Sequence, residues 1–108
     1  MTDEVERAFQ ALQLEYLGSL PERLDELRSD VARLRAGDSE ARASLKVRLH
    51  RLAGSGGSYG FVALSSIARE AEKYLASPQP ATELDHLEEI IQRLAKTAQE
   101  ADAEMKRR

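Results

Sequence analysis

Hydrophobic residues recur along this chain at intervals of three and four, the spacing of one face of an α-helix. No segment shows the strict alternation or the enrichment in β-branched residues that is typical of a strand. Each periodic segment is bounded by glycine, proline or a residue that favours a helix cap. The pattern therefore predicts an all-α protein.

The N-terminal third is predicted to hold two helices. A short helix over 3–16 carries a stripe in which apolar residues follow one another by four, three and four positions. Gly18 and Ser19 interrupt the pattern, and Pro21 suits the first turn of a second helix, which ends near Gly37.

Three further helices are predicted in the remainder. Asp38 or Ser39 caps a helix over about 39–59, and Gly60 ends it. The next helix begins at 62 or 63 and stops before Ser77-Pro78-Gln79-Pro80. Thr82 caps the last helix, and the charged tail over about 101–108 is expected to fray.

Four longer helices with short connections favour one domain over 1–108, an antiparallel up-and-down four-helix bundle with an additional short N-terminal helix. The alternative is a helical hairpin that dimerises into a bundle. So many break signals in so short a chain favour the monomer over a long coiled coil.

The amino-acid composition argues against several classes of function. Only 5% of residues are aromatic, so the core is aliphatic, and the net charge of -3 argues against a nucleic-acid surface. Without cysteine there is no disulfide, thiolate nucleophile or cysteine metal site. The acidic N-terminus and the lack of an apolar run of about 18 residues predict a cytoplasmic protein with neither a signal peptide nor a membrane span.

Glycine is concentrated just after His50. Of the six glycines, Gly54, Gly56, Gly57 and Gly60 lie in one short stretch. Each glycine inside a helix costs about 1 kcal/mol relative to alanine, so a benefit must offset the cost. We expect Gly54 to leave space beside an imidazole that another molecule reaches. We expect Gly56 and Gly57 to admit a closely packed neighbouring helix.

Helical rotation places His50 about 130° from the core stripe of its own helix, and therefore at the surface. An ordinary surface histidine is the alternative interpretation. The small or weakly apolar residues around it instead indicate a shallow docking surface. This predicted surface consists of Ala43, Val47, Ala53, Gly54 and Gly57.

The stretch His50-Arg51-Leu52-Ala53-Gly54-Ser55, continued by Gly57, Tyr59, Gly60 and Phe61, resembles the core motif of histidine-containing phosphotransfer (HPt) domains. Those domains are helical bundles of similar length, and the following Ala63-Leu64-Ser65 also resembles the family. The family often has lysine three residues after the histidine, where this chain has Ala53. Lys46, one turn before His50, and the adjacent Arg51 are the candidates for electrostatic support of a phosphoryl group.

The resemblance implies a phosphoryl carrier without autonomous kinase activity. His50 would be phosphorylated and would pass the group between receiver-domain aspartates of a hybrid sensor kinase and a response regulator. The carrier needs no cofactor of its own, since Mg²⁺ is expected on the receiver. We expect a monomer that binds neither nucleic acid nor membrane.

Other functions remain as alternatives or are excluded. A helical adaptor that binds a receiver or kinase domain through the same surface without phosphorylation is the alternative function. An ATP-dependent kinase domain does not fit within 108 residues. The stretch 54–58 lacks the strand and the lysine of a phosphate loop, and no metal site is predicted from His50 and His86.

Overall fold

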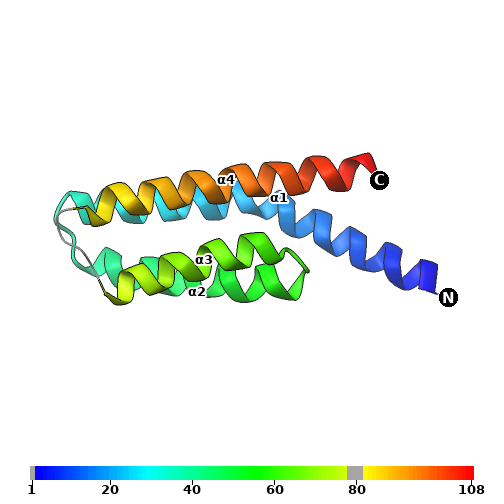
Figure 1. The fold of residues 1–108 in the computed structure, drawn as a ribbon, viewed down its shortest axis with the longest axis horizontal. Helices are drawn as coiled ribbons and strands as arrows, with labels where there is room; N and C mark the ends of the chain where they lie inside the picture. Colours follow the sequence, from blue (N-terminus) through cyan, green and yellow to red (C-terminus); the bar gives the residue numbers. More distant parts are fainter. Residues whose placement is uncertain (1, 78–81) are drawn as a thin grey trace.

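The computed structural model describes residues 2–77 and 82–108, and these form four α-helices without any strand. The helices are α1 (Thr2–Arg35), α2 (Glu40–Ser58), α3 (Val62–Ala76) and α4 (Glu83–Arg107). Successive helices run in opposite directions (Figure 1). The prediction of an all-α, antiparallel up-and-down bundle is confirmed.

Each helix packs against two neighbours. In the described residues the backbones of α1 and α3 each lie close to those of both α2 and α4. Across one diagonal, Arg42 of α2 forms an ion pair with the buried Glu83 of α4. The result is an elongated body of 53 × 20 × 18 Å. Its core is mainly aliphatic, as the composition predicts, and the largest fully buried apolar side chains are Leu20, Leu27, Leu45, Leu49, Leu52, Leu64, Leu75, Leu87, Ile90 and Leu94.

The predicted division of the N-terminal third into two helices is wrong. A single helix, α1, continues through Gly18 and Ser19, and Pro21 lies inside it. Proline in a helix interior removes one backbone hydrogen bond and typically costs about 3 kcal/mol. Here Leu17, Leu20 and Leu24 are all buried on one face across the predicted break. Their burial against the other helices outweighs the local signals.

The N-terminal part of α1 projects beyond the α2–α3 turn and diverges from α4 (Figure 1). Its apolar stripe is consequently exposed: Val5 is 66%, Phe9 41% and Leu12 49% accessible. The stripe is the continuation of Tyr16, which is buried where α1 reaches the α2–α3 turn. The short amphipathic pattern in the sequence therefore marks an extension of α1, not a separate helix.

The helix ends agree in part with the prediction. Gly37 and Gly60 have φ values of 96° and 85°, the left-handed conformation that glycine adopts after a helix. The Asp38 carboxylate accepts a hydrogen bond from the Glu40 backbone N–H at 3.1 Å. Thr82 is the N-cap residue of α4, but its side chain makes no capping hydrogen bond. Ser77 follows α3 directly, while the rest of the predicted break, 78–81, lies outside the described residues.

The C-terminal tail, expected to fray, is part of α4 up to Arg107. Met105 is only 7% exposed, so the end of α4 packs against the bundle through this side chain. Of the helices described, none is both long enough and apolar enough to cross a membrane.

Candidate functional site

His50 lies on the outer face of α2. Leu45, Leu49 and Leu52 anchor the opposite face of the helix in the core, each no more than 2% exposed. The side chain of His50 is 80% exposed, as the helical rotation predicts. The bundle thus presents an imidazole on a rigid element and leaves it accessible to another molecule.

Glu72 of α3 holds this imidazole. The distance from His50 Nδ1 to Glu72 Oε2 is 2.9 Å, and the Glu72 side chain is 28% exposed. An ionised carboxylate only accepts hydrogen bonds, so Nδ1 carries the proton. In a neutral imidazole the lone pair is then on Nε2, the ring nitrogen that is free to act as a nucleophile.

Glu72 is not among the site residues predicted from the sequence. Its position next to the buried Ala71 and three residues before the buried Leu75 places it at the edge of the core face of α3. Recognising its role requires the pairing of α2 with α3, which brings two residues 22 positions apart together. A single sequence does not contain that register.

The glycines of α2 serve two different purposes. A Cβ added at Gly54 would have no heavy atom within 4 Å, so this position opens space beside His50. A Cβ at Gly56 would lie 3.4 Å from the Ser65 backbone nitrogen, and one at Gly57 would lie 3.4 Å from Ser65 Oγ. Gly56 and Gly57 therefore lie at the contact between α2 and α3 where a neighbouring helix was expected, and an added Cβ would just touch Ser65.

The predicted docking surface needs one correction. Ala43, Gly54 and Gly57 are exposed, and Val47 is 48% accessible. Ala53, in contrast, is only 3% exposed, and its backbone carbonyl accepts a hydrogen bond from Ser65 Oγ at 2.6 Å. It faces α3 because helical rotation turns it toward the core side of α2. Ala53 is part of the core and cannot contact a partner.

The cations near His50 lie on two sides of it. Lys46 is exposed one turn before His50, on the side of α2 that turns toward α3. Arg51 is exposed on the opposite side, where it lines a groove between α1 and α2. On α3, the exposed Arg69 lies between Ser65 and Glu72 on the face that adjoins α2. Within 2–77 and 82–108, none of these three forms an ion pair with a carboxylate.

Arg48, also on α2, is held in ion pairs with two carboxylates of α1. It pairs with Glu26 of α1, and its Nε lies 2.9 Å from Asp30 Oδ2. Asp30 is 2% exposed and also accepts a hydrogen bond from Ser44 Oγ at 3.1 Å. This network fixes α2 against α1 just before His50, so Arg48 has a structural role.

His86 and Ser55 lie outside this site. The ring of His86 packs against that of Tyr74 at a tilt of 39°, with centroids 4.2 Å apart, and His86 does not approach His50. Ser55 Oγ lies 2.7 Å from the hydroxyl of Tyr16, and the stretch 54–58 is helical instead of forming a phosphate loop. No group of side chains suited to bind a metal ion occurs in the part of the chain that the structure describes.

A comparison with protein families connects this geometry to a known class. The Hpt domain family matches residues 11–104, which include all four helices apart from the N-terminal part of α1 and the last turn of α4. No curated protein and no solved structure matches the chain.

Proposed function

Since the chain belongs to the Hpt domain family, whose members are phosphocarrier modules that interact with receiver domains, we propose that it carries a phosphoryl group on His50 in a two-component phosphorelay. The proposed partners are receiver domains of response regulators, of hybrid histidine kinases, or of both. We infer that the chain acts in the cytoplasm as a monomer. The chain itself is expected to have no kinase activity.

The transfer is a pair of displacements at phosphorus. The Nε2 lone pair of His50 attacks the aspartyl phosphate of one receiver, and a P–N bond forms as the P–O bond to the aspartate breaks. The released electron pair stays on the aspartate carboxylate. A second receiver aspartate then attacks the phosphohistidine, and the P–N bond breaks. Throughout, the proton on Nδ1 remains hydrogen-bonded to Glu72.

The observation that carries the proposal is the exposed imidazole whose Nδ1 is bound to Glu72 at 2.9 Å. This contact orients the ring and leaves Nε2 available, and the empty space at Gly54 lets a partner approach it. The receiver would supply Mg²⁺ and the acidic pocket around its aspartate, so His50 needs only access and orientation.

We assign electrostatic support of the phosphoryl group to Lys46, on the side of His50 that turns toward α3. Arg69 joins it as a candidate because it lies on the adjoining face of α3. The family lysine has no counterpart here, since the residue at this position is the buried Ala53. Arg51 faces the α1–α2 groove, which suits contact with the partner better than contact with the phosphoryl group.

The missing lysine is also the observation that favours the alternative. A chain that lacks a cation at position 53 is a candidate for an adaptor, which would bind a receiver or kinase domain through Val47 and Gly54 without accepting phosphate. The two functions differ in one property, the dependence on a nucleophilic nitrogen at residue 50.

The decisive experiment is phosphoryl transfer from a panel of purified receiver domains, each phosphorylated with labelled acetyl phosphate. The wild-type chain should acquire acid-labile, base-stable label, and His50→Gln should acquire none. His86→Gln is the matched control and should be labelled like the wild type. Binding of a receiver without any label would identify the adaptor instead.

A further inference from the structure

Charge is distributed unevenly over this acidic chain. The chain carries a net charge of -3, yet α2 contains four Lys or Arg residues and a single Glu. The basic residues Lys46, Arg48 and Arg51 all lie within one turn of His50. A local field of opposite sign to the whole molecule is the arrangement that steers an oppositely charged partner to one face.

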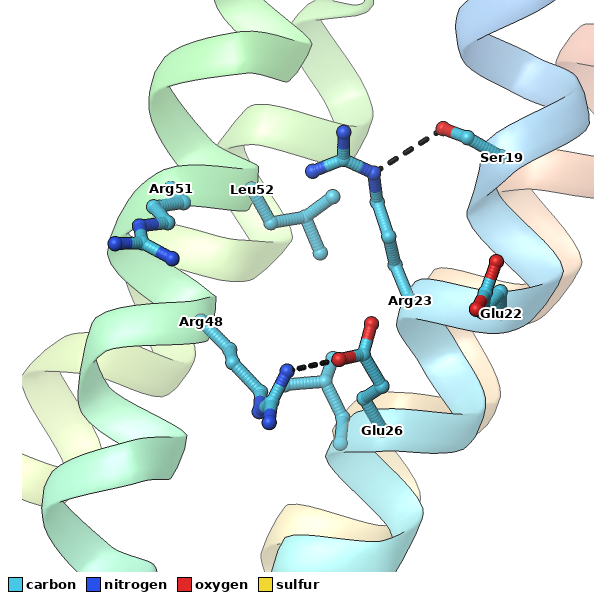
Figure 2. Close-up of a pocket in the computed structure, with 8 residues that line it drawn as sticks. Ser19, Glu22, Arg23, Glu26, Arg48, Arg51 and Leu52 are labelled. Atoms are coloured by element: carbon cyan, nitrogen blue, oxygen red, sulfur yellow. Dashed lines mark hydrogen bonds and ion pairs between the residues drawn. The ribbon is translucent and has the colours of Figure 1, made fainter.

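A groove beside this basic side of α2 is lined by Arg23, Arg48 and Arg51 (Figure 2). It has a volume of about 330 Å³ and runs between α1 and α2, with the buried Leu27 and Leu52 among its lining residues. Arg51 borders it on α2, and Arg23 leans over it from α1 (Figure 2). Arg51 lies about 100° further round α2 than His50, so a partner surface that spans the outer face of α2 reaches both the imidazole and the rim of this groove.

The two arginines are available for such a partner. Arg23 donates from Nε to Ser19 Oγ at 3.1 Å and lies 5.4 Å from the centre of the Tyr16 ring, so its stem is fixed. Neither Arg23 nor Arg51 pairs with a carboxylate among the residues that the structure describes, whereas Arg48 is held by Glu26 and Asp30. Guanidinium groups in this state favour bidentate contact with carboxylates.

We propose that the α1–α2 groove is the electrostatic half of the docking surface, and that Arg23 and Arg51 bind carboxylates at the rim of the receiver domain's acidic phosphorylation site. This inference rests on the proposed function. The apolar half is the exposed strip of α2 formed by Ala43, Val47 and Gly54. Helical rotation places this strip between His50 and Arg51, so a receiver that covers both halves also brings its aspartyl phosphate to Nε2.

A protein fits the groove better than a nucleic acid. Glu22 and Glu26 line the same groove on the α1 side, so a uniform polyanion would meet negative charge a few ångströms from the arginines. A protein surface carries both signs and is able to place carboxylates against the arginines and a cation against Glu22. The mixed pattern therefore gives specificity for a particular receiver as well as attraction.

The test is charge reversal with transfer kinetics. Arg23→Glu, Arg51→Glu and the double variant are compared with wild type, using the phosphorylated receiver that labels the wild type fastest. Each single variant should lower kcat/KM about tenfold at low salt, and leave the rate at saturating receiver unchanged. The wild-type rate should fall as salt rises, and that dependence should be weaker in the double variant.

Lys96→Glu is the matched control, because Lys96 is exposed on α4, the helix diagonal to α2. It makes the same change in net charge and should transfer like the wild type. Unchanged kcat/KM in both arginine variants, or an equal loss in Lys96→Glu, overturns the inference while His50 labelling preserves the proposed function. Absence of label on wild type overturns both.

A second experiment tests whether a nucleic acid occupies the groove instead of a receiver domain. Wild-type protein is mixed with a short fluorescent single-stranded oligonucleotide, and anisotropy is recorded at low salt. We expect no binding. Binding that disappears in Arg51→Glu would assign the groove to nucleic acid and overturn the receiver assignment.

Discussion

At the scale of single residues, the site depends on one polar contact. Glu72 accepts a hydrogen bond from Nδ1 of His50, and this contact decides both the tautomer and the direction of the ring. Because His50 is 80% exposed, few other contacts restrain the imidazole. Glu72 is accordingly a positioning residue for the proposed transfer, and its removal should affect the rate more than the fold.

We predict that Glu72→Ala lowers the transfer rate at saturating receiver about tenfold, which corresponds to about 1.4 kcal/mol of lost orientation. Glu72→Gln retains an acceptor oxygen and should keep most of the rate. Nitrogen-15 NMR of the imidazole supplies the structural readout, since loss of the acceptor should mix the two tautomers. Wild-type kinetics in Glu72→Ala would show that the contact does not orient the ring.

Gly54 offers a second residue-scale prediction, because its added Cβ meets no neighbour. Gly54→Ala should raise the free energy of unfolding by about 1 kcal/mol through helix propensity alone. Gly54→Leu should fold equally well but lower kcat/KM about tenfold, as its side chain occupies the space that a partner needs.

The matched control for Gly54→Leu is Gly18→Leu. Gly18 is likewise exposed in a helix with no heavy atom near an added Cβ, but it lies on α1. Chemical denaturation gives the stability and receiver titration gives kcat/KM. Equal kinetics for both leucine variants would remove Gly54 from the docking surface.

At the scale of elements, Tyr16 of α1 packs against the α2–α3 turn. Its ring stacks on Tyr59, with centroids 4.6 Å apart, and on Phe61 at 6.1 Å. Its hydroxyl lies 2.7 Å from Ser55 Oγ. Burial raises the pKa of the Tyr16 hydroxyl above its ordinary value, although the hydrogen bond with Ser55 opposes this. This is the point from which the N-terminal part of α1 projects beyond the bundle.

The direction of that pKa shift gives a pH prediction. The unfolded tyrosine ionises near pH 10, before the folded one, so this contribution to stability is complete below about pH 10 and is lost as the pH rises toward the higher folded pKa. Tyr16→Phe should cost about 1 kcal/mol at neutral pH through the lost hydrogen bond. It should also lose less stability than wild type between about pH 9 and 11.

Denaturant unfolding of wild type and Tyr16→Phe at neutral pH, at about pH 9 and at about pH 11 checks this prediction. Tyr74→Phe is the control, since the hydroxyl of Tyr74 lies a longer 3.4 Å from Thr82 Oγ1 and belongs to an exposed contact. An identical alkaline loss in wild type and Tyr16→Phe would contradict the assignment.

The elements also show what the sequence could and could not predict. Periodicity identified the helices and the exposed face of His50 because these depend on local rotation along one helix. The prediction of a helix break near Pro21 was wrong, because the burial of Leu17, Leu20 and Leu24 against the other helices outweighs the local signal. Glu72 and the burial of Ala53 escaped prediction for the same reason, since both depend on how α3 packs against α2.

At the scale of the whole molecule, docking and chemistry are separable. The chemistry resides in one nitrogen atom of His50, whereas docking depends on the outer face of α2 and on the groove beside it. The helices that form these surfaces are anchored by core residues such as Leu49 and Leu52, which substitution of an exposed imidazole does not disturb. A chain without the nucleophile should therefore still occupy the receiver.

We accordingly predict that His50→Gln is a competitor. Added in excess to wild type and a phosphorylated receiver, it should slow labelling of the wild type in proportion to the receiver it binds, while remaining unlabelled. His50→Gln combined with Arg51→Glu should compete less well, because it lacks part of the docking charge. Quench-flow or gel-based label counting at increasing competitor gives the inhibition constant. If His50→Gln fails to compete at concentrations where wild type binds, the imidazole itself carries the affinity, and docking and transfer are one event instead of two.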